Sequence, residues 1–90
     1  MKGTHVIVHG RVQGVYFRDY TYRQAISLEL TGWVRNLSDG TVEGLFFGED
    51  DDIKKMLQWL ETGSPSSKVD KIVSAEKFVE IAPFSFQIRY

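Results

Sequence analysis

The sequence predicts an α+β sandwich, in which an antiparallel β-sheet carries two helices on one face, in the order β-α-β-β-α-β with a short terminal strand. Three observations predict this fold. Two segments have apolar residues at helical spacing, the runs around them alternate as strands do, and Asp39-Gly40 marks a tight hairpin between two apolar runs. Residues 1–90 contain no repeat, low-complexity stretch or linker, so we expect one domain.

The first strand and the first helix are expected on either side of a loop that contains two glycines. Apolar and polar residues alternate over Thr4–His9, which predicts the strand. A helix is expected from about Arg18 to Leu28, because apolar and small residues recur there at spacings typical of one helix face. The residues expected on that face are Thr21, Tyr22, Ala25, Ile26 and Leu28.

Four acidic residues, Glu49–Asp52, open the second helix, which is expected to end at Gly63. Acidic residues in a first turn complement the helix dipole, which is a stronger explanation for them than a metal site. The buried stripe of this helix is expected to be Ile53, Met56, Leu57 and Leu60. The remaining strands are expected at Gly32–Asn36, Thr41–Gly48, Val69–Phe78 and Phe84–Ile88. This split βαβ order is typical of a ferredoxin-like sandwich.

Charge and composition exclude several classes of function. Eleven basic and twelve acidic residues give a net charge of -1, which argues against a general nucleic-acid binder. Five basic and two acidic residues lie between Met1 and Asn36, and this local positive field would attract a small anion. The chain has no cysteine, no apolar run that could span a membrane and no apolar leader. We therefore expect a cytoplasmic protein without a membrane partner.

The segment Gly10–Arg18 has the sequence Gly-Arg-Val-Gln-Gly-Val-Tyr-Phe-Arg and joins the first strand to the first helix. Backbone N–H groups in such a loop can converge on one point, and a helix start adds free donors and partial positive charge. Arg18 could then close over an anion with a planar fork that matches phosphate oxygens. The alternative is a plain connection, in which Gly10 and Gly14 only permit unusual backbone angles.

A second segment, Gly32–Gly44, has the sequence Gly-Trp-Val-Arg-Asn-Leu-Ser-Asp-Gly-Thr-Val-Glu-Gly. It predicts a strand, a tight turn and a second strand, with Asn36 at a strand end beside the turn. Asparagine is common in such places because its side chain can bond to its own backbone. Taken alone, this segment gives Asn36 no function beyond the turn.

Together the two segments resemble the signatures of the acylphosphatase family, Gly-x-Val-Gln-Gly-Val-x-Phe-Arg and Gly-Trp-Val-x-Asn followed by x-x-x-Gly-x-Val. The similarity extends to Thr21, to Gly63-Ser64-Pro65 and to Phe86–Tyr90, so it covers nearly the whole chain. The resemblance implies the ferredoxin-like fold and an enzyme that hydrolyses the carboxyl–phosphate bond of acyl phosphates.

The resemblance also implies which residues carry the reaction. Arg18 would bind the phosphoryl group, and Asn36 would orient the attacking water. Together with the Arg18 side chain, the phosphate would be held by the backbone N–H groups of Val12, Gln13, Gly14, Val15, Tyr16 and Phe17. A carboxylate leaving group, whose conjugate acid has a pKa of about 4, departs without a general acid. The expected ligands are an acyl phosphate and inorganic phosphate, no cofactor or metal is needed, and we expect a monomer.

Other positions carry weaker expectations. The family commonly has glycine where Glu29 ends the first helix, so a left-handed Glu29 would cost on the order of 1 kcal/mol. Arg89 and Tyr90 are expected either to brace the phosphate-binding loop, through a side chain or the terminal carboxylate, or to fray. His5 and His9 alternate on the first strand without an evident third ligand, so we expect ordinary sheet residues rather than a metal site.

Two other functions are compatible with parts of the sequence. A non-catalytic anion-binding domain would use the same loop, as do acylphosphatase-like domains of larger proteins that handle carbamoyl phosphate. RNA-recognition domains share the element order, but their third strand carries a basic-Gly-aromatic-Gly-aromatic pattern. The corresponding run here, Thr41–Phe47, contains an acidic residue and no basic one. Turnover of an acyl phosphate would test the first alternative, and an electrophoretic shift the second.

Overall fold

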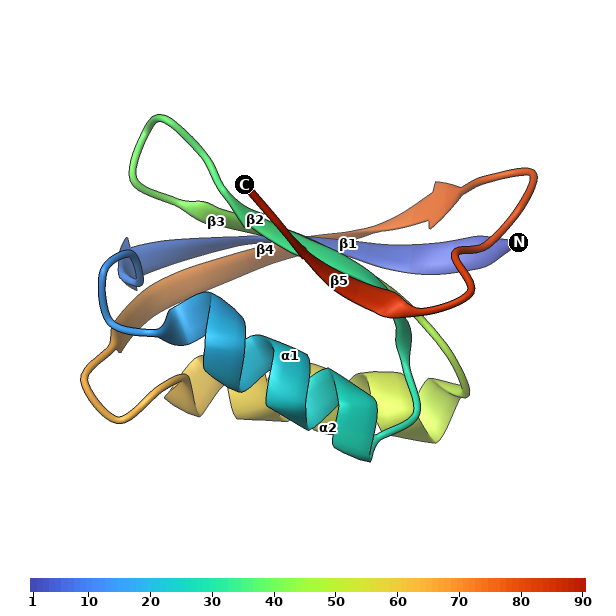
Figure 1. Ribbon diagram of the computed structural model, residues 1–90, viewed down its shortest axis with the longest axis horizontal. Coiled ribbons are helices and arrows are strands. Elements are labelled where there is room, and N and C mark those ends of the chain that lie inside the picture. Colours follow the sequence, from blue (N-terminus) through green and yellow to red (C-terminus); the bar gives the residue numbers. More distant parts are fainter.

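The computed structural model describes residues 1–90 as two layers, a five-stranded sheet with both helices on one of its faces (Figure 1). The elements in chain order are β1 (Lys2–Arg11), α1 (Phe17–Ser27), β2 (Thr31–Asn36), β3 (Val42–Phe47), α2 (Asp50–Thr62), β4 (Lys68–Phe78) and β5 (Phe86–Arg89). The predicted fold class and element order are therefore confirmed. Neither helix is long and apolar enough to cross a membrane.

The strand order is β4-β1-β3-β2-β5. The first four strands pair antiparallel, whereas β5 pairs with β2 in parallel, so the complete sheet is mixed. After β4 the chain crosses the end of the sheet through residues 79–85 and returns along the outer edge of β2 (Figure 1). Since Arg89 is in register with Arg35, this return brings the C-terminal Tyr90 to the end of β2 where Asn36 lies.

The core fills the space between the helices and the covered face of the sheet. Val8 of β1 is 0% exposed, and Met56 and Leu60 of α2 are equally well buried, as predicted. Ile53 and Leu57 are partly buried and pack against the same cluster. The apolar stripe of α2 therefore holds this helix firmly on the sheet.

The first helix differs from its prediction. It begins one residue earlier, at Phe17, and Tyr22 and Ile26 are 36% and 47% exposed rather than on the buried face. The buried stripe consists of Phe17, Thr21 and Ala25, which follow one another at a spacing of four residues. Successive helical residues lie about 100° apart around the axis. Tyr22 and Ile26 directly follow Thr21 and Ala25, so their side chains point away from this narrow stripe.

Glu29 adopts the left-handed conformation that the sequence suggested, with φ of 58°. Its N–H donates to the carbonyl of Ile26 at 3.0 Å, and the N–H of Leu30 donates to that of Ala25 at 2.9 Å. These bonds satisfy carbonyls in the last turn of α1, so the strained backbone is part of a hydrogen-bonded helix end.

Beyond the predicted Thr4–His9, β1 continues at both ends and pairs with β4 from Lys2 to Arg11. The register shifts between His9 and Gly10, where Gly10 has φ of 132°. A Cβ at Gly10 would collide with the backbone of β4, so this position requires glycine. The bulge ends the regular strand just before the loop that leads to α1.

The uncovered face of the sheet carries a cluster of charged side chains. Nε2 of His5 lies 2.7 Å from one carboxylate oxygen of Glu43, and Nε of Arg35 donates to the other oxygen at 2.6 Å. Burial acts to raise the pKa of Glu43, but the hydrogen bonds from His5 and Arg35 outweigh it and hold this pKa below its ordinary value. His5 is a sheet residue, as expected, and its side chain has a carboxylate partner that the sequence did not reveal.

Candidate active site

The loop between β1 and α1 has an unusual backbone. Gly14 has φ of 73°, and Tyr16, which caps the start of α1, has φ of 59°. A left-handed conformation is strained for tyrosine, and such strain in non-glycine residues gathers at functional sites. Turns that mix left-handed and right-handed residues direct successive N–H groups into one concavity and thereby form anion-binding nests.

The N–H groups of this loop have no partners within the chain. No backbone hydrogen bond outside the regular elements starts from any residue between Gln13 and Asp19, and the first turn of α1 has no side-chain cap. Free donors at a helix start carry the positive end of the helix dipole. A row of them that continues into the preceding loop is suited to bind an anion such as phosphate.

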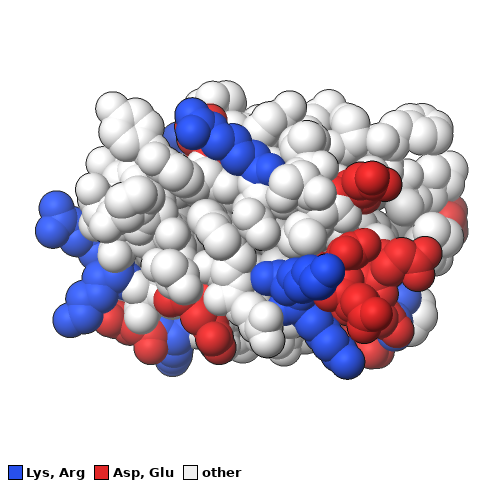
Figure 2. All heavy atoms as spheres, turned by 90° about the horizontal axis from the view of Figure 1, so that it is seen from below, with Lys and Arg blue, Asp and Glu red and all other residues white.

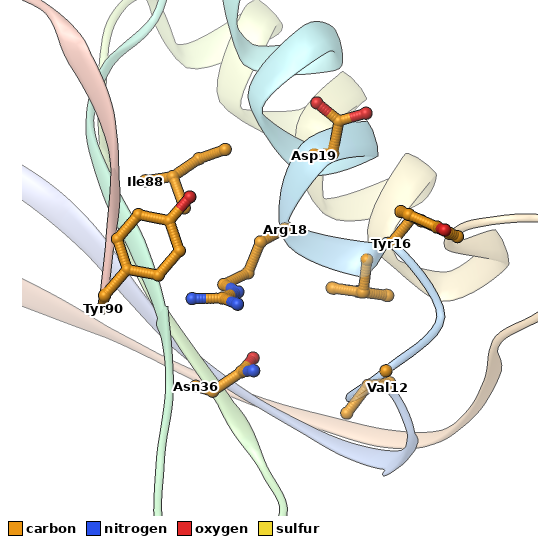
Figure 3. A pocket seen from close by; sticks show the side chains of 9 residues that line it. Val12, Tyr16, Arg18, Asp19, Asn36, Ile88 and Tyr90 are labelled. Carbon is orange, nitrogen blue, oxygen red and sulfur yellow. The ribbon is translucent and has the colours of Figure 1, made fainter.

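A pocket of about 440 Å³ opens in front of the loop. Figure 3 shows that its walls come from the loop and the start of α1, from the end of β2 and from the C-terminal segment. The nine lining residues are Val12, Gly14, Tyr16, Phe17, Arg18, Asp19, Asn36, Ile88 and Tyr90. Both side chains singled out from the sequence, Arg18 and Asn36, therefore face the same pocket although they lie on different elements.

Arg18 extends into the pocket and is held from the C-terminal side (Figure 3). Its Nη1 atom donates to the carbonyl of Arg89 at 3.0 Å, and its guanidinium carbon lies 4.7 Å from the centre of the Tyr90 ring. The side chain of Arg89 does not take part, because its guanidinium lies over Trp33. The C-terminal residues thus contact Arg18 itself rather than the loop backbone, through a ring and a main-chain carbonyl.

Asn36 has a buried side-chain oxygen, Oδ1, without a hydrogen-bond partner. The turn beside it does not use this side chain. Asp39 fills that role, because its carboxylate accepts bonds from the hydroxyl and the N–H of Thr41, and the hydroxyl bond is the main cause of the lowered pKa of Asp39. Buried polar atoms nearly always have partners, so the unpaired Oδ1 shows that the fold does not use the hydrogen-bonding capacity of this pocket side chain.

Two of the residues whose N–H groups were expected to hold the phosphate, Gln13 and Val15, do not line the pocket. The Gln13 side chain instead donates to the carbonyls of Leu37 and Thr41, both at 2.7 Å, and so ties the loop to the turn after Asn36. Nothing in the local pattern indicated this role, because both acceptors are main-chain atoms that are distant in sequence.

Two pocket residues, Asp19 and Ile88, were not foreseen from the sequence. Asp19 forms an ion pair with Arg23 at 2.8 Å, and Figure 3 shows its carboxylate turned away from Arg18. Figure 2 views the helix side, where acidic side chains gather at the end of the molecule at which α2 begins. The loop before α1 lies at the opposite end (Figure 1), so most of this negative charge is remote from the pocket.

Comparisons with known proteins agree with the geometry. The acylphosphatase family model matches residues 4–88. The chain is 48% identical over 85 residues to an acylphosphatase of Syntrophotalea carbinolica, which covers 94% of this chain and 92% of the relative. It superposes on the crystal structure of acylphosphatase from Bacillus subtilis with a TM-score of 0.94 and 38% identity, over 100% of both chains.

A larger protein also contains this unit. The structure of HypF from T. kodakarensis matches with a TM-score of 0.89 and 32% identity, over 99% of this chain and 12% of that one. The family model, the relatives of similar length and the shared fold agree, and this chain belongs to the acylphosphatase family.

Proposed function

We propose that this chain hydrolyses acyl phosphates to a carboxylate and inorganic phosphate, by attack of a water that Asn36 orients on a phosphoryl group held by the loop and Arg18. The family assignment supports the reaction. One observation carries the assignment of the site residues. Unpaired backbone donors around Gly14 and Tyr16 share a single pocket with Arg18 and with Asn36, whose side chain the fold does not bind.

The phosphoryl group is bound by the loop and by Arg18. Free N–H groups of the loop and the first turn of α1 donate to its non-bridging oxygens. Arg18 has five N–H donors, and its single contact with the Arg89 carbonyl leaves several for a bidentate contact with phosphate. These groups are fixed before the reaction begins, so they stabilise the charge of the transition state without reorganisation.

Asn36 positions the water. Its side-chain amide forms a hydrogen bond with the water molecule and directs the oxygen lone pair toward phosphorus. As the oxygen–phosphorus bond forms, the bond from phosphorus to the acyl oxygen breaks, and the carboxylate leaves with the electron pair. The proton of the water passes to a phosphate oxygen. The carboxylate is a good leaving group, so the pocket requires no general acid and no metal ion.

The proposal also covers the setting of the enzyme. The active species that we propose is a monomer, in which one chain supplies the loop, Arg18 and Asn36. Its ligands are a small acyl phosphate and inorganic phosphate, and nucleic acid is not among them. We place the protein in the cytoplasm, in keeping with a sequence that has no cysteine.

The experiment that tests this function is steady-state hydrolysis of acetyl phosphate, measured beside an alkyl phosphate monoester and in the presence of EDTA. We expect turnover of acetyl phosphate alone, because an alkoxide leaves poorly without a proton donor. Chelation should leave the rate unchanged. Comparable turnover of both substrates, or activity that requires a divalent ion, would contradict the proposed chemistry.

A further inference from the structure

Ser64 contacts the loop from behind the pocket. Its hydroxyl donates to the main-chain carbonyl of Val15 at 2.8 Å, across 49 positions of the chain. Both residues are buried, with exposed fractions of 2% for Ser64 and 7% for Val15, and neither lines the pocket. The connection between α2 and β4 thus holds one particular carbonyl of the phosphate-binding loop.

The Ser64 hydroxyl is itself firmly placed. The N–H and the hydroxyl of Ser67 both donate to the Ser64 carbonyl, at 3.0 and 2.7 Å. Gly63 ends α2 with φ of 71°, and a Cβ there would collide with Ser67 and with the Phe17 ring. This close packing leaves the connection little freedom to move relative to the start of α1.

The carbonyl of Val15 and the N–H of Tyr16 belong to the same peptide unit. The chain has no cis peptide bond, so these two groups point in opposite directions. With the carbonyl directed toward Ser64, the Tyr16 N–H is directed away from it, and Tyr16 lines the pocket with this N–H unpaired. The bond to Ser64 therefore determines which way this donor faces.

Strain in the loop favours the opposite orientation. Rotation of the peptide unit between Val15 and Tyr16 would change φ of Tyr16 and could release it from the left-handed value of 59°. It would also turn a carbonyl oxygen toward the pocket, where it would repel phosphate. We propose that Ser64 is a positioning residue that prevents this rotation and keeps the Tyr16 N–H directed at the phosphoryl group. This inference rests on the proposed function.

The test compares Ser64→Ala with the wild type and with two controls. Ser64→Thr retains a hydroxyl, and Ser66→Ala removes an exposed serine hydroxyl of the same connection. The probe is inorganic phosphate, and the readouts are its dissociation constant at a temperature well below unfolding and the shift of the Tyr16 amide resonance during titration. We expect Ser64→Ala to bind phosphate about tenfold more weakly, as for the loss of one hydrogen bond to a charged group. The Tyr16 shift should be lost, while both controls behave as the wild type.

The outcomes are distinguishable. If Ser64→Ala loses thermal stability but binds phosphate with wild-type affinity and retains the Tyr16 shift, Ser64 has only a structural role and the inference is wrong. The wild-type titration decides the matter even if this variant does not fold, because a Tyr16 amide that ignores phosphate while its neighbours respond also overturns the inference. A wild type in which no loop amide responds to phosphate would overturn the proposed function and this inference with it.

Discussion

The guanidinium of Arg18 lies 4.7 Å from the centre of the Tyr90 ring while its Nη1 atom donates to the adjacent carbonyl of Arg89. Arg18 stands on the first turn of α1, and both partners belong to the last two residues of the chain. Parallel pairing of β5 with β2 brings that end of the chain to the pocket. The terminal strand therefore completes the pocket as well as the sheet.

This contact predicts that substitution of Tyr90 has a modest effect on activity. In Tyr90→Ala, Arg18 should lose one of its two supports, and kcat/KM should fall a few-fold, since an exposed cation–π contact contributes about 0.5–1 kcal/mol. Tyr90→Phe retains the ring and should behave as the wild type. Steady-state kinetics on acetyl phosphate measure both. Equal activity of the alanine variant would show that Arg18 does not depend on the ring.

Substitution of Arg18 itself should reduce activity far more than substitution of Tyr90. Arg18→Ala should weaken phosphate binding and nearly abolish turnover, because it removes a charge-assisted contact with the reacting group. Arg18→Lys should restore little, since an ammonium cannot form the planar two-point contact. Phosphate should raise the melting temperature of the wild type, with a stabilisation of about 2.7 kcal/mol at a hundred times its dissociation constant. If phosphate raises the melting temperature of Arg18→Ala as much as that of the wild type, Arg18 does not bind the phosphoryl group.

Gln13 should stabilise the fold through its side chain. Gln13→Met keeps the length of the side chain but removes both hydrogen bonds to the hairpin carbonyls of Leu37 and Thr41. We expect the free energy of unfolding to fall by about 1–3 kcal/mol, because each of the two lost hydrogen bonds contributes about 0.5–1.5 kcal/mol. Urea unfolding measures this, with Gln58→Met on the exposed side of α2 as the matched control. Equal stability of the two variants would contradict it.

The lowered pKa of Glu43 predicts that the stability of the fold depends on pH. Its pKa is lower in the folded chain than in the unfolded one, so its contribution is present above the unfolded value, near 4.5, and is lost as pH falls through the lower, folded value. Glu43→Gln should therefore be less stable than the wild type near neutral pH, and the difference should shrink in that acidic range. Melting temperatures across pH test this, and a difference that does not change with pH would contradict it.

The element order and the two motifs could be predicted because they depend on local patterns. The alternation in β1, the apolar stripe of α2 and the Asp39-Gly40 turn each follow from a few neighbouring residues. The pairing partner of β5 could not be predicted in this way. The parallel pairing with β2 is set by the path of residues 79–85 across the end of the sheet, which no local pattern records.

The two main side chains of the candidate site could be predicted from the sequence. The side-chain contacts that hold the loop in place could not. Resemblance to the family pointed to Arg18 and Asn36, and the structure places both on one pocket. The contacts of Gln13 and Ser64 are made to main-chain carbonyls distant in sequence, and a carbonyl is common to every residue. Residue identities therefore could not reveal which carbonyl each side chain would meet.

The most direct test of the account is Asn36→Ala, with kcat for acetyl phosphate and the dissociation constant of inorganic phosphate measured on the same preparation. If Asn36 positions the water, kcat should fall by about a hundredfold or more, on the scale of other polar groups that act in the transition state. Phosphate affinity and the melting temperature should stay close to the wild type, because the loop and Arg18 are unchanged. Loss of phosphate binding in step with turnover, or full retention of turnover, would contradict the role of Asn36 and with it the proposed mechanism.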